Sequence, residues 1–132
     1  MEINILHLYY DILNLYGEYG NVVIMKKHLE DQGFKVNLDK KTVGEEIDFN
    51  KYHFIYMGCG TEKNLDFVLE DLKKYTKEIN SVIENKRVFL ATGNSFEMLG
   101  KTIDNNEALG IFDFKVKREK DRETSDVIYK SK

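Results

Sequence analysis

Residues 89–96 read Phe89-Leu90-Ala91-Thr92-Gly93-Asn94-Ser95-Phe96. The apolar run at residues 87–91 predicts a buried strand, and residues 95–101 predict a short helix with Phe96 and Leu99 facing inward. A strand that turns sharply into a helix presents its apex residue at the rim of a sheet, which is how nucleophile-elbow enzymes hold a Ser or Cys. Here the apex is Gly93, which accepts a strained φ at no steric cost but carries no nucleophile.

Strands and helices alternate along the rest of the chain. Apolar runs at residues 3–9, 34–38 and 53–57 predict strands, and helical spacing predicts helices at residues 22–32 and 65–82. Residues 39–51 are polar and predict a loop. Residues 110–116 and 126–129 predict two strands around a charged turn, and residues 117–123 predict a solvated hairpin. The alternation predicts an α/β, flavodoxin-like, three-layer domain with a mainly parallel sheet, and residues 1–132 are expected to form one domain.

The composition excludes several classes of protein. A formal net charge of -3 gives no reason to expect nucleic-acid binding, and no apolar run is long enough for a membrane helix. A single Cys permits neither an internal disulfide nor a multi-Cys zinc site, and no signal peptide is visible, so a cytoplasmic location is expected. The chain has no P-loop and no complete dinucleotide fingerprint, so no cofactor is expected.

Three loops are expected to meet where ligands bind in parallel sheets, at the carboxyl ends of the strands. They are residues 10–21, 58–62 and 92–95. Cys59 in the second loop is a candidate displaced nucleophile, but an unactivated thiol is mostly protonated at neutral pH, so a structural role is favoured. Ser95 in the third loop is favoured as a helix N-cap or first-turn residue over a nucleophile. Asp11 and Glu18 in the first loop receive no assigned role.

The three histidines suggest no catalytic base. His7 is expected on a strand, His28 on a helix surface, and His53 on the strand that precedes Cys59. Alternate strand residues point to opposite faces, so His53 gives no clear partner for the thiol. No set of His, Cys or carboxylate residues has convincing metal-ligand spacing.

Four segments in one order resemble class I glutamine amidotransferase domains of the cobyric acid synthase type. They are an opening loop at residues 8–21, a glycine-rich strand end at residues 57–62, the elbow at residues 90–100 and a following strand at residues 110–118. Within that family, the chain is most similar to the glutaminase subunit of lipid II isoglutaminyl synthase. The resemblance implies a place in cobalamin or peptidoglycan biosynthesis, and a domain that is truncated relative to the full class I glutaminase fold.

The resemblance also implies what the site lacks and what it keeps. The family's elbow carries a catalytic Cys where this chain has Gly93, and its catalytic His and acidic partner fall beyond Lys132. The backbone N–H groups near Gly60 and Asn94 resemble the family's oxyanion hole, and Arg118 matches an Arg near its pocket. The candidate ligand-binding or oxyanion-like residues are therefore Gly58, Cys59, Gly60, Gly93, Asn94, Ser95 and Arg118, with no catalytic residue and no metal.

Three functions stay open from the sequence. The first is a glutamine amidotransferase-like domain without glutaminase activity, which serves as a binding or scaffold partner of an amidating synthase. For that role the resemblance implies a Mur-ligase-like synthase subunit. The second is a fragment of an active amidotransferase, and the third is an unrelated flavodoxin-like regulatory or nucleotide-binding domain. An uncovered strand at the sheet edge would also favour a homodimer, because such an edge is a template for pairing.

Overall fold

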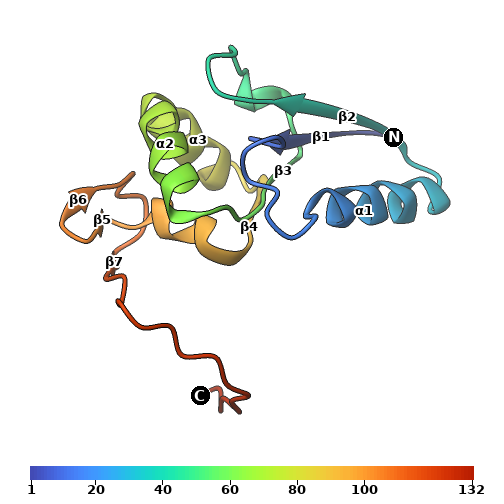
Figure 1. Ribbon diagram of the computed structural model, residues 1–132. Helices are drawn as coiled ribbons and strands as arrows, with labels where there is room; N and C mark the ends of the chain where they lie inside the picture. Colours follow the sequence, from blue (N-terminus) through green and yellow to red (C-terminus); the bar gives the residue numbers. More distant parts are fainter.

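A four-stranded parallel sheet forms the centre of the fold (Figure 1). A computed structural model describes residues 1–132. The strand order is β2-β1-β3-β4, and the strands are β1 (Glu2–Leu8), β2 (Lys35–Lys41), β3 (Phe54–Met57) and β4 (Val88–Ala91). Because all four strands run parallel, their carboxyl ends meet at one edge of the sheet. The expected α/β, flavodoxin-like class is confirmed.

Helices cover both faces of the sheet (Figure 1). Helix α1 (Tyr19–Asp31) lies on one face, where its buried Val22 packs with Ile5 of β1. Helices α2 (Glu62–Leu72) and α3 (Thr76–Glu84) lie on the other face, where Leu6 and Leu8 belong to the larger apolar core. Alternate residues of β1 therefore serve opposite layers, as the two-residue period of a strand requires.

The long helix expected at residues 65–82 is broken in the middle. A single 3₁₀ turn, η2 (Lys73–Tyr75), separates α2 from α3. The hydroxyl of Tyr75 donates to the carbonyl oxygen of Glu45 at 2.8 Å, and its ring packs against Phe49 with 5.1 Å between the centroids. The break thus places Tyr75 against the loop that follows β2, while Leu65, Ile79 and Val82 still face the core.

The short helix after β4 also differs from the expectation. It is a 3₁₀ helix, η3 (Gly93–Leu99), which begins two residues earlier than the predicted one. With three residues per turn, Ser95 and Met98 share one face, and both are fully buried. Leu99 is buried as expected, but Phe96 is 48% exposed and packs against Phe114, so its predicted inward position is wrong.

The C-terminal quarter contains less regular structure than the sequence predicts. A small sheet has the order β6-β5-β7, and its strands are β5 (Thr102–Ile103), β6 (Asn106–Glu107) and β7 (Lys115–Val116). Only the last two residues of the strand predicted at residues 110–116 therefore form one. Residues 126–129 form no strand, because no neighbouring strand pairs with them, and residues 117–123 form no hairpin.

Two smaller corrections concern the ends of elements. Helix α1 begins at Tyr19, three residues before the predicted start, so Gly20 lies inside the helix and Gly17, with a φ of 76°, supplies the turn. Strand β2 extends to Lys41, and Phe49–Lys51 forms the 3₁₀ turn η1, so the loop predicted at residues 39–51 is shorter. No helix is both long and apolar enough to cross a membrane.

Candidate functional site

The three loops expected at the carboxyl edge of the sheet do meet there. The first is tied to the second by the Leu15 N–H group, which donates to the Cys59 carbonyl oxygen at 3.1 Å. The second is tied to the third by hydrogen bonds between Gly60 and Asn94. The loops that follow β1, β3 and β4, each identified from the sequence, are therefore hydrogen-bonded to one another.

Gly93 stands at the apex of the turn and has the left-handed backbone of an elbow. Its φ is 62°, a conformation that side chains with a Cβ rarely adopt. A Cβ placed on Gly93 would lie 2.5 Å from the Cβ of Cys59 and 3.1 Å from its Sγ. The contact with Cys59 and the positive φ therefore both favour glycine at this position.

Cys59 lies in the wall that faces Gly93, and its thiol is bound to a carboxylate. The thiol donates to Oε1 of Glu18, and the Cys59 N–H group reaches the same oxygen at 3.3 Å. Burial, the hydrogen bond to Glu18 and the charge of that carboxylate raise the pKa of Cys59 to about 11. The thiol is therefore protonated at neutral pH, which is the unreactive form.

Glu18 is a site residue to which no role was assigned from the sequence. Its side chain is buried, and its second carboxylate oxygen accepts the Tyr16 N–H group at 3.0 Å. Burial favours the neutral acid, but hydrogen bonds from the Cys59 thiol and from backbone N–H groups outweigh it, so the pKa of Glu18 lies below its ordinary value. One signal was available, namely a single acid between two glycines in a loop expected at the ligand edge.

No histidine is positioned to activate the thiol. His53 precedes β3 at the opposite end of that strand, where its Nδ1 accepts the Asn4 N–H group at 2.9 Å. His28 lies on the exposed surface of α1, as expected. His7 lies on β1, also as expected, but it is fully buried and neither of its ring nitrogens has a hydrogen-bond partner.

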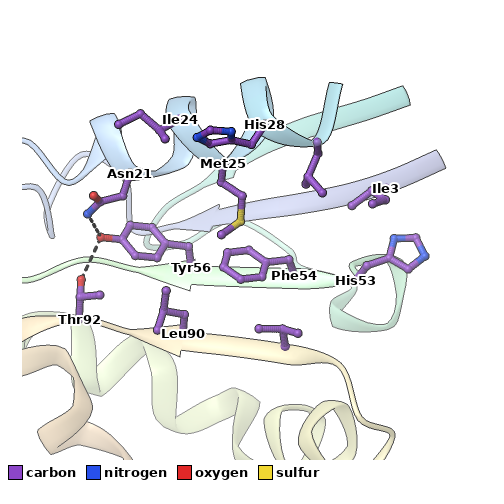
Figure 2. A pocket seen from close by; sticks show the side chains of 12 residues that line it. Ile3, Asn21, Ile24, Met25, His28, His53, Phe54, Tyr56, Leu90 and Thr92 are labelled. Atoms are coloured by element: carbon purple, nitrogen blue, oxygen red, sulfur yellow. Dashed lines mark hydrogen bonds between the residues drawn. The ribbon is translucent and has the colours of Figure 1, made fainter. Parts of the chain in front are cut away.

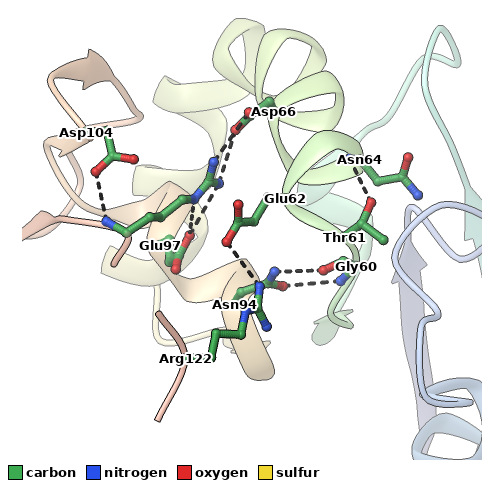
Figure 3. A network of polar contacts seen from close by, with 10 residues as sticks. Gly60, Thr61, Glu62, Asn64, Asp66, Asn94, Glu97, Asp104 and Arg122 are labelled. Carbon is green, nitrogen blue, oxygen red and sulfur yellow. Dashed lines mark hydrogen bonds and ion pairs between the residues drawn. The ribbon is translucent and has the colours of Figure 1, made fainter. Parts of the chain in front are cut away.

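The Asn94 side chain forms a bracket with the backbone of Gly60 (Figure 3). Its Nδ2 donates to the Gly60 carbonyl oxygen at 2.7 Å, and its Oδ1 accepts the Gly60 N–H group at 3.2 Å. The chain's own carboxamide thus occupies the backbone donor that the resemblance assigns to an oxyanion hole. A carboxamide or carboxylate that binds Gly60 must first displace Asn94.

The bracket should contribute measurably to stability. Replacement Asn94→Ala is expected to lower the free energy of unfolding by about 1–2 kcal/mol, because two hydrogen bonds are lost. The measurement is urea denaturation at neutral pH. Asn85→Ala is a suitable control, because the Asn85 amide makes only an exposed 3.3 Å contact with Ser81. Equal losses in the two variants would show that the bracket contributes nothing.

Ser95 is held as a structural residue of the first turn. Its hydroxyl lies 2.8 Å from the Thr92 carbonyl oxygen and 3.2 Å from that of Met57, so one proton is shared between two carbonyl groups. The residue that precedes η3 is Thr92, so Ser95 is a first-turn residue and not the N-cap. Its hydroxyl is fully buried, and no basic side chain hydrogen-bonds to it.

Arg118 lies in a polar hollow that the bracket residue Asn94 also lines. The hollow has a volume of about 520 Å³, and Asn94, Glu97 and Arg118 are among the residues that line it. The Arg118 guanidinium contacts Asp66 at 3.1 Å and Glu97 at 3.4 Å. Burial raises the pKa of Glu97, although the positive charge of Arg118 opposes the shift. Two carboxylates therefore already compensate the charge that an anionic ligand would need.

A larger, apolar groove lies on the α1 side of the sheet (Figure 2). It has a volume of about 670 Å³ between α1, β3 and β4. Val88 and Leu90 of β4 line it and are 52% and 40% exposed. The Tyr56 hydroxyl, at its inner end, accepts a hydrogen bond from Asn21 at 3.0 Å and lies 2.9 Å from the Thr92 hydroxyl. The groove therefore reaches the residue immediately before the elbow apex.

Comparison with known proteins assigns the chain to one family. The profile of CobB/CobQ-like glutamine amidotransferase domains matches residues 4–132. The chain is 31% identical over 100 residues to the lipid II isoglutaminyl synthase (glutamine-hydrolyzing) subunit GatD of Streptococcus pneumoniae. The aligned region covers 76% of this chain and 38% of that relative. It is 28% identical over 135 residues to the subunit of the same name from Staphylococcus aureus. That alignment covers 98% of this chain and 56% of the relative. The chain thus spans between about two fifths and just over half of these relatives.

Proposed function

The chain belongs to the family of CobB/CobQ-like glutamine amidotransferase domains, and from that premise we propose that it has no glutaminase activity of its own. It serves instead as a binding or scaffold partner of an amidating synthase. The observation that carries this proposal is Gly93, which stands at the elbow apex with a φ of 62° and no side chain. Glutamine hydrolysis in this family needs a thiol at that position, according to the resemblance of the elbow segment.

The other polar groups of the site support an inactive role. The Cys59 thiol faces the Glu18 carboxylate, which keeps the thiol protonated. The Ser95 hydroxyl is turned toward two backbone carbonyl groups. Gly60 donates its N–H group to Asn94. These three groups, each of which could start or stabilise an acyl transfer, are therefore engaged by neighbours within the chain.

A synthase subunit is the proposed partner, of the Mur-ligase-like kind that the resemblance implies. Support comes from the two relatives, which are both named as subunits of a lipid II isoglutaminyl synthase. Self-association is the second candidate, and strand β4 favours it. This strand lies at the edge of the sheet, and the side chains of its own residues Val88 and Leu90 are exposed. An edge strand with unpaired backbone groups is a template for a strand of another chain.

Ammonia release tests the absence of activity. The purified chain, at micromolar concentration, is incubated with glutamine, and the ammonia and glutamate formed are measured. The glutaminase subunit of an intact relative serves as the positive control. We expect no release above the rate without protein. Release that disappears in Cys59→Ser or Ser95→Ala would overturn the proposal. Light scattering of the same sample distinguishes a monomer from a self-associated dimer, and co-purification with a synthase subunit tests the partner.

A further inference from the structure

We infer that Cys59 and Gly93 form an exchange pair, in which the Cys59 side chain fills the volume that an elbow side chain would need. The site accommodates a side chain at either position but not at both. The inference rests on the proposed function, in which residue 93 is the apex of an elbow without its nucleophile. It adds that the empty apex is closed from the facing loop, so restoring a side chain at residue 93 requires a second change at residue 59.

The overlap arises between the Cβ positions of residues 59 and 93. A Cβ on Gly93 would lie 2.5 Å from the Cβ of Cys59, a separation that real Cβ atoms essentially never show. A Cβ is fixed to the backbone, so no rotation of the Cys59 side chain relieves the overlap. Only removal of that Cβ or movement of a backbone segment creates space.

The loop that carries Cys59 cannot retreat easily. A Cβ on Gly58 would lie 2.5 Å from the Leu13 carbonyl oxygen and 2.7 Å from the Glu18 side chain, and a Cβ on Gly60 would lie 2.8 Å from Leu13 Cδ2. Glycines at residues 58 and 60 therefore let the loop press against the first loop, with no gap behind it. Hydrogen bonds from Cys59 to Glu18 and from Leu15 to Cys59 hold it there. Cys59, the one residue of this segment that has a side chain, is therefore held in place from behind.

The contact also defines what the thiol does. Its Sγ lies 3.1 Å from the Cβ position of residue 93, and its proton is directed to the Glu18 carboxylate. A thiol whose proton is held by a carboxylate and which has no histidine partner lacks the activated nucleophile that acyl transfer requires. The Cys59 side chain therefore fills the space at the elbow apex and does not act as a nucleophile there.

A double-mutant cycle tests the pair. The variants are Gly93→Ala, Cys59→Gly and the double variant, and the folding equilibrium constant of each is measured by urea denaturation of the full chain. Gly93→Ala is expected to reduce that constant roughly tenfold more in the native background than in the Cys59→Gly background. Backbone strain at the positive φ remains in both backgrounds, so the difference isolates the contact with residue 59. Equal reductions in the two backgrounds would overturn the inference.

A matched control separates steric overlap from the loss of the thiol. Cys59→Ala removes Sγ and its hydrogen bond but keeps the Cβ that lies 2.5 Å from the apex position. It should leave most of the cost of Gly93→Ala in place, whereas Cys59→Gly should remove it. Equal relief by both would overturn the Cβ argument. If Gly93→Ala alone does not fold, refolding in the Cys59→Gly background supports the pair, and failure there, while Cys59→Gly itself folds, contradicts it.

The cycle and the ammonia assay fail independently. Ammonia release by the native chain would overturn the proposed function without changing the measured coupling between residues 59 and 93. An absence of coupling would overturn the exchange pair but would not affect the proposal that the chain lacks glutaminase activity.

Discussion

Lowering the pH from 7 to 4 is expected to reduce the free energy of unfolding of the native chain by about 3 kcal/mol more than that of a His7→Phe chain. His7 is fully buried on β1, and neither ring nitrogen has a hydrogen-bond partner. Burial first, and the positive charge of Lys40 second, lower the pKa of His7 from 6.5 to about 4, while the charge of Glu18 opposes the shift. The folded chain therefore keeps this imidazole neutral.

The sign follows from where the proton binds. Between pH 6.5 and about 4 the unfolded chain protonates His7 and the folded chain does not, so each fall in pH favours the unfolded state. The stability contributed by the neutral ring is fully present above pH 6.5 and is lost as the pH falls toward 4. The surroundings offer no acceptor for a second ring proton, because the ring packs against the aromatic side chains of Tyr10, Tyr19 and Tyr56.

The measurement is chemical denaturation of both chains at several pH values between 7 and 4. Phenylalanine keeps an aromatic ring in the stack and removes the titration, so the slope with pH is the quantity compared. Other titrating groups are common to the two chains and largely cancel. Parallel pH profiles would mean that the folded chain accommodates the imidazolium, by opening the contact between α1 and β1.

The sheet was predictable from the sequence because its strands carry local signals. Strand β3 is an unbroken apolar run, β1 is apolar at four of its seven positions, and the apolar residues of the helices between strands recur at three and four residues. The break at Lys73–Tyr75 was not predictable, since neither Gly nor Pro marks it and the Tyr75 hydrogen bond that accompanies it goes to the distant Glu45 carbonyl group. The strand predicted at residues 126–129 is absent for a related reason. Strand propensity forms a strand only where a neighbouring strand pairs with it.

Some features of the candidate site were likewise predictable from the sequence and others were not. The left-handed turn at Gly93 and the meeting of three loops follow from local sequence and from parallel topology. The overlap of residue 93 with Cys59 depends on the register of β3 and β4, in which Met57 pairs with Ala91, and on the close approach of the first loop. The Asn94 bracket has the same origin. Contacts between residues more than thirty positions apart carry no signal in one sequence.

Glu18 is expected to be the strongest single polar contributor to the site. Replacement Glu18→Ala should lower the free energy of unfolding by about 3 kcal/mol, because the N–H groups of Tyr16 and Cys59 and the Cys59 thiol lose a charged acceptor. Glu18→Gln keeps the shape and one acceptor oxygen, so it should lose roughly half as much. Glu30→Ala is the control, because Glu30 makes an exposed ion pair with Lys26 at 2.9 Å and should change stability by less than about 0.5 kcal/mol.

Urea denaturation gives the size of the Glu18 effect, and amide hydrogen exchange gives its location. Exchange at Tyr16 and Cys59 should accelerate in Glu18→Ala beyond the amount set by global stability, since both N–H groups then lack a partner. A loss no larger than that of Glu30→Ala would show that the carboxylate is dispensable. Because the Glu18 side chain fills the space behind Gly58, its removal should also leave room for the loop that carries Cys59 to move away from residue 93. Gly93→Ala should then be tolerated better in the Glu18→Ala background than in the native chain.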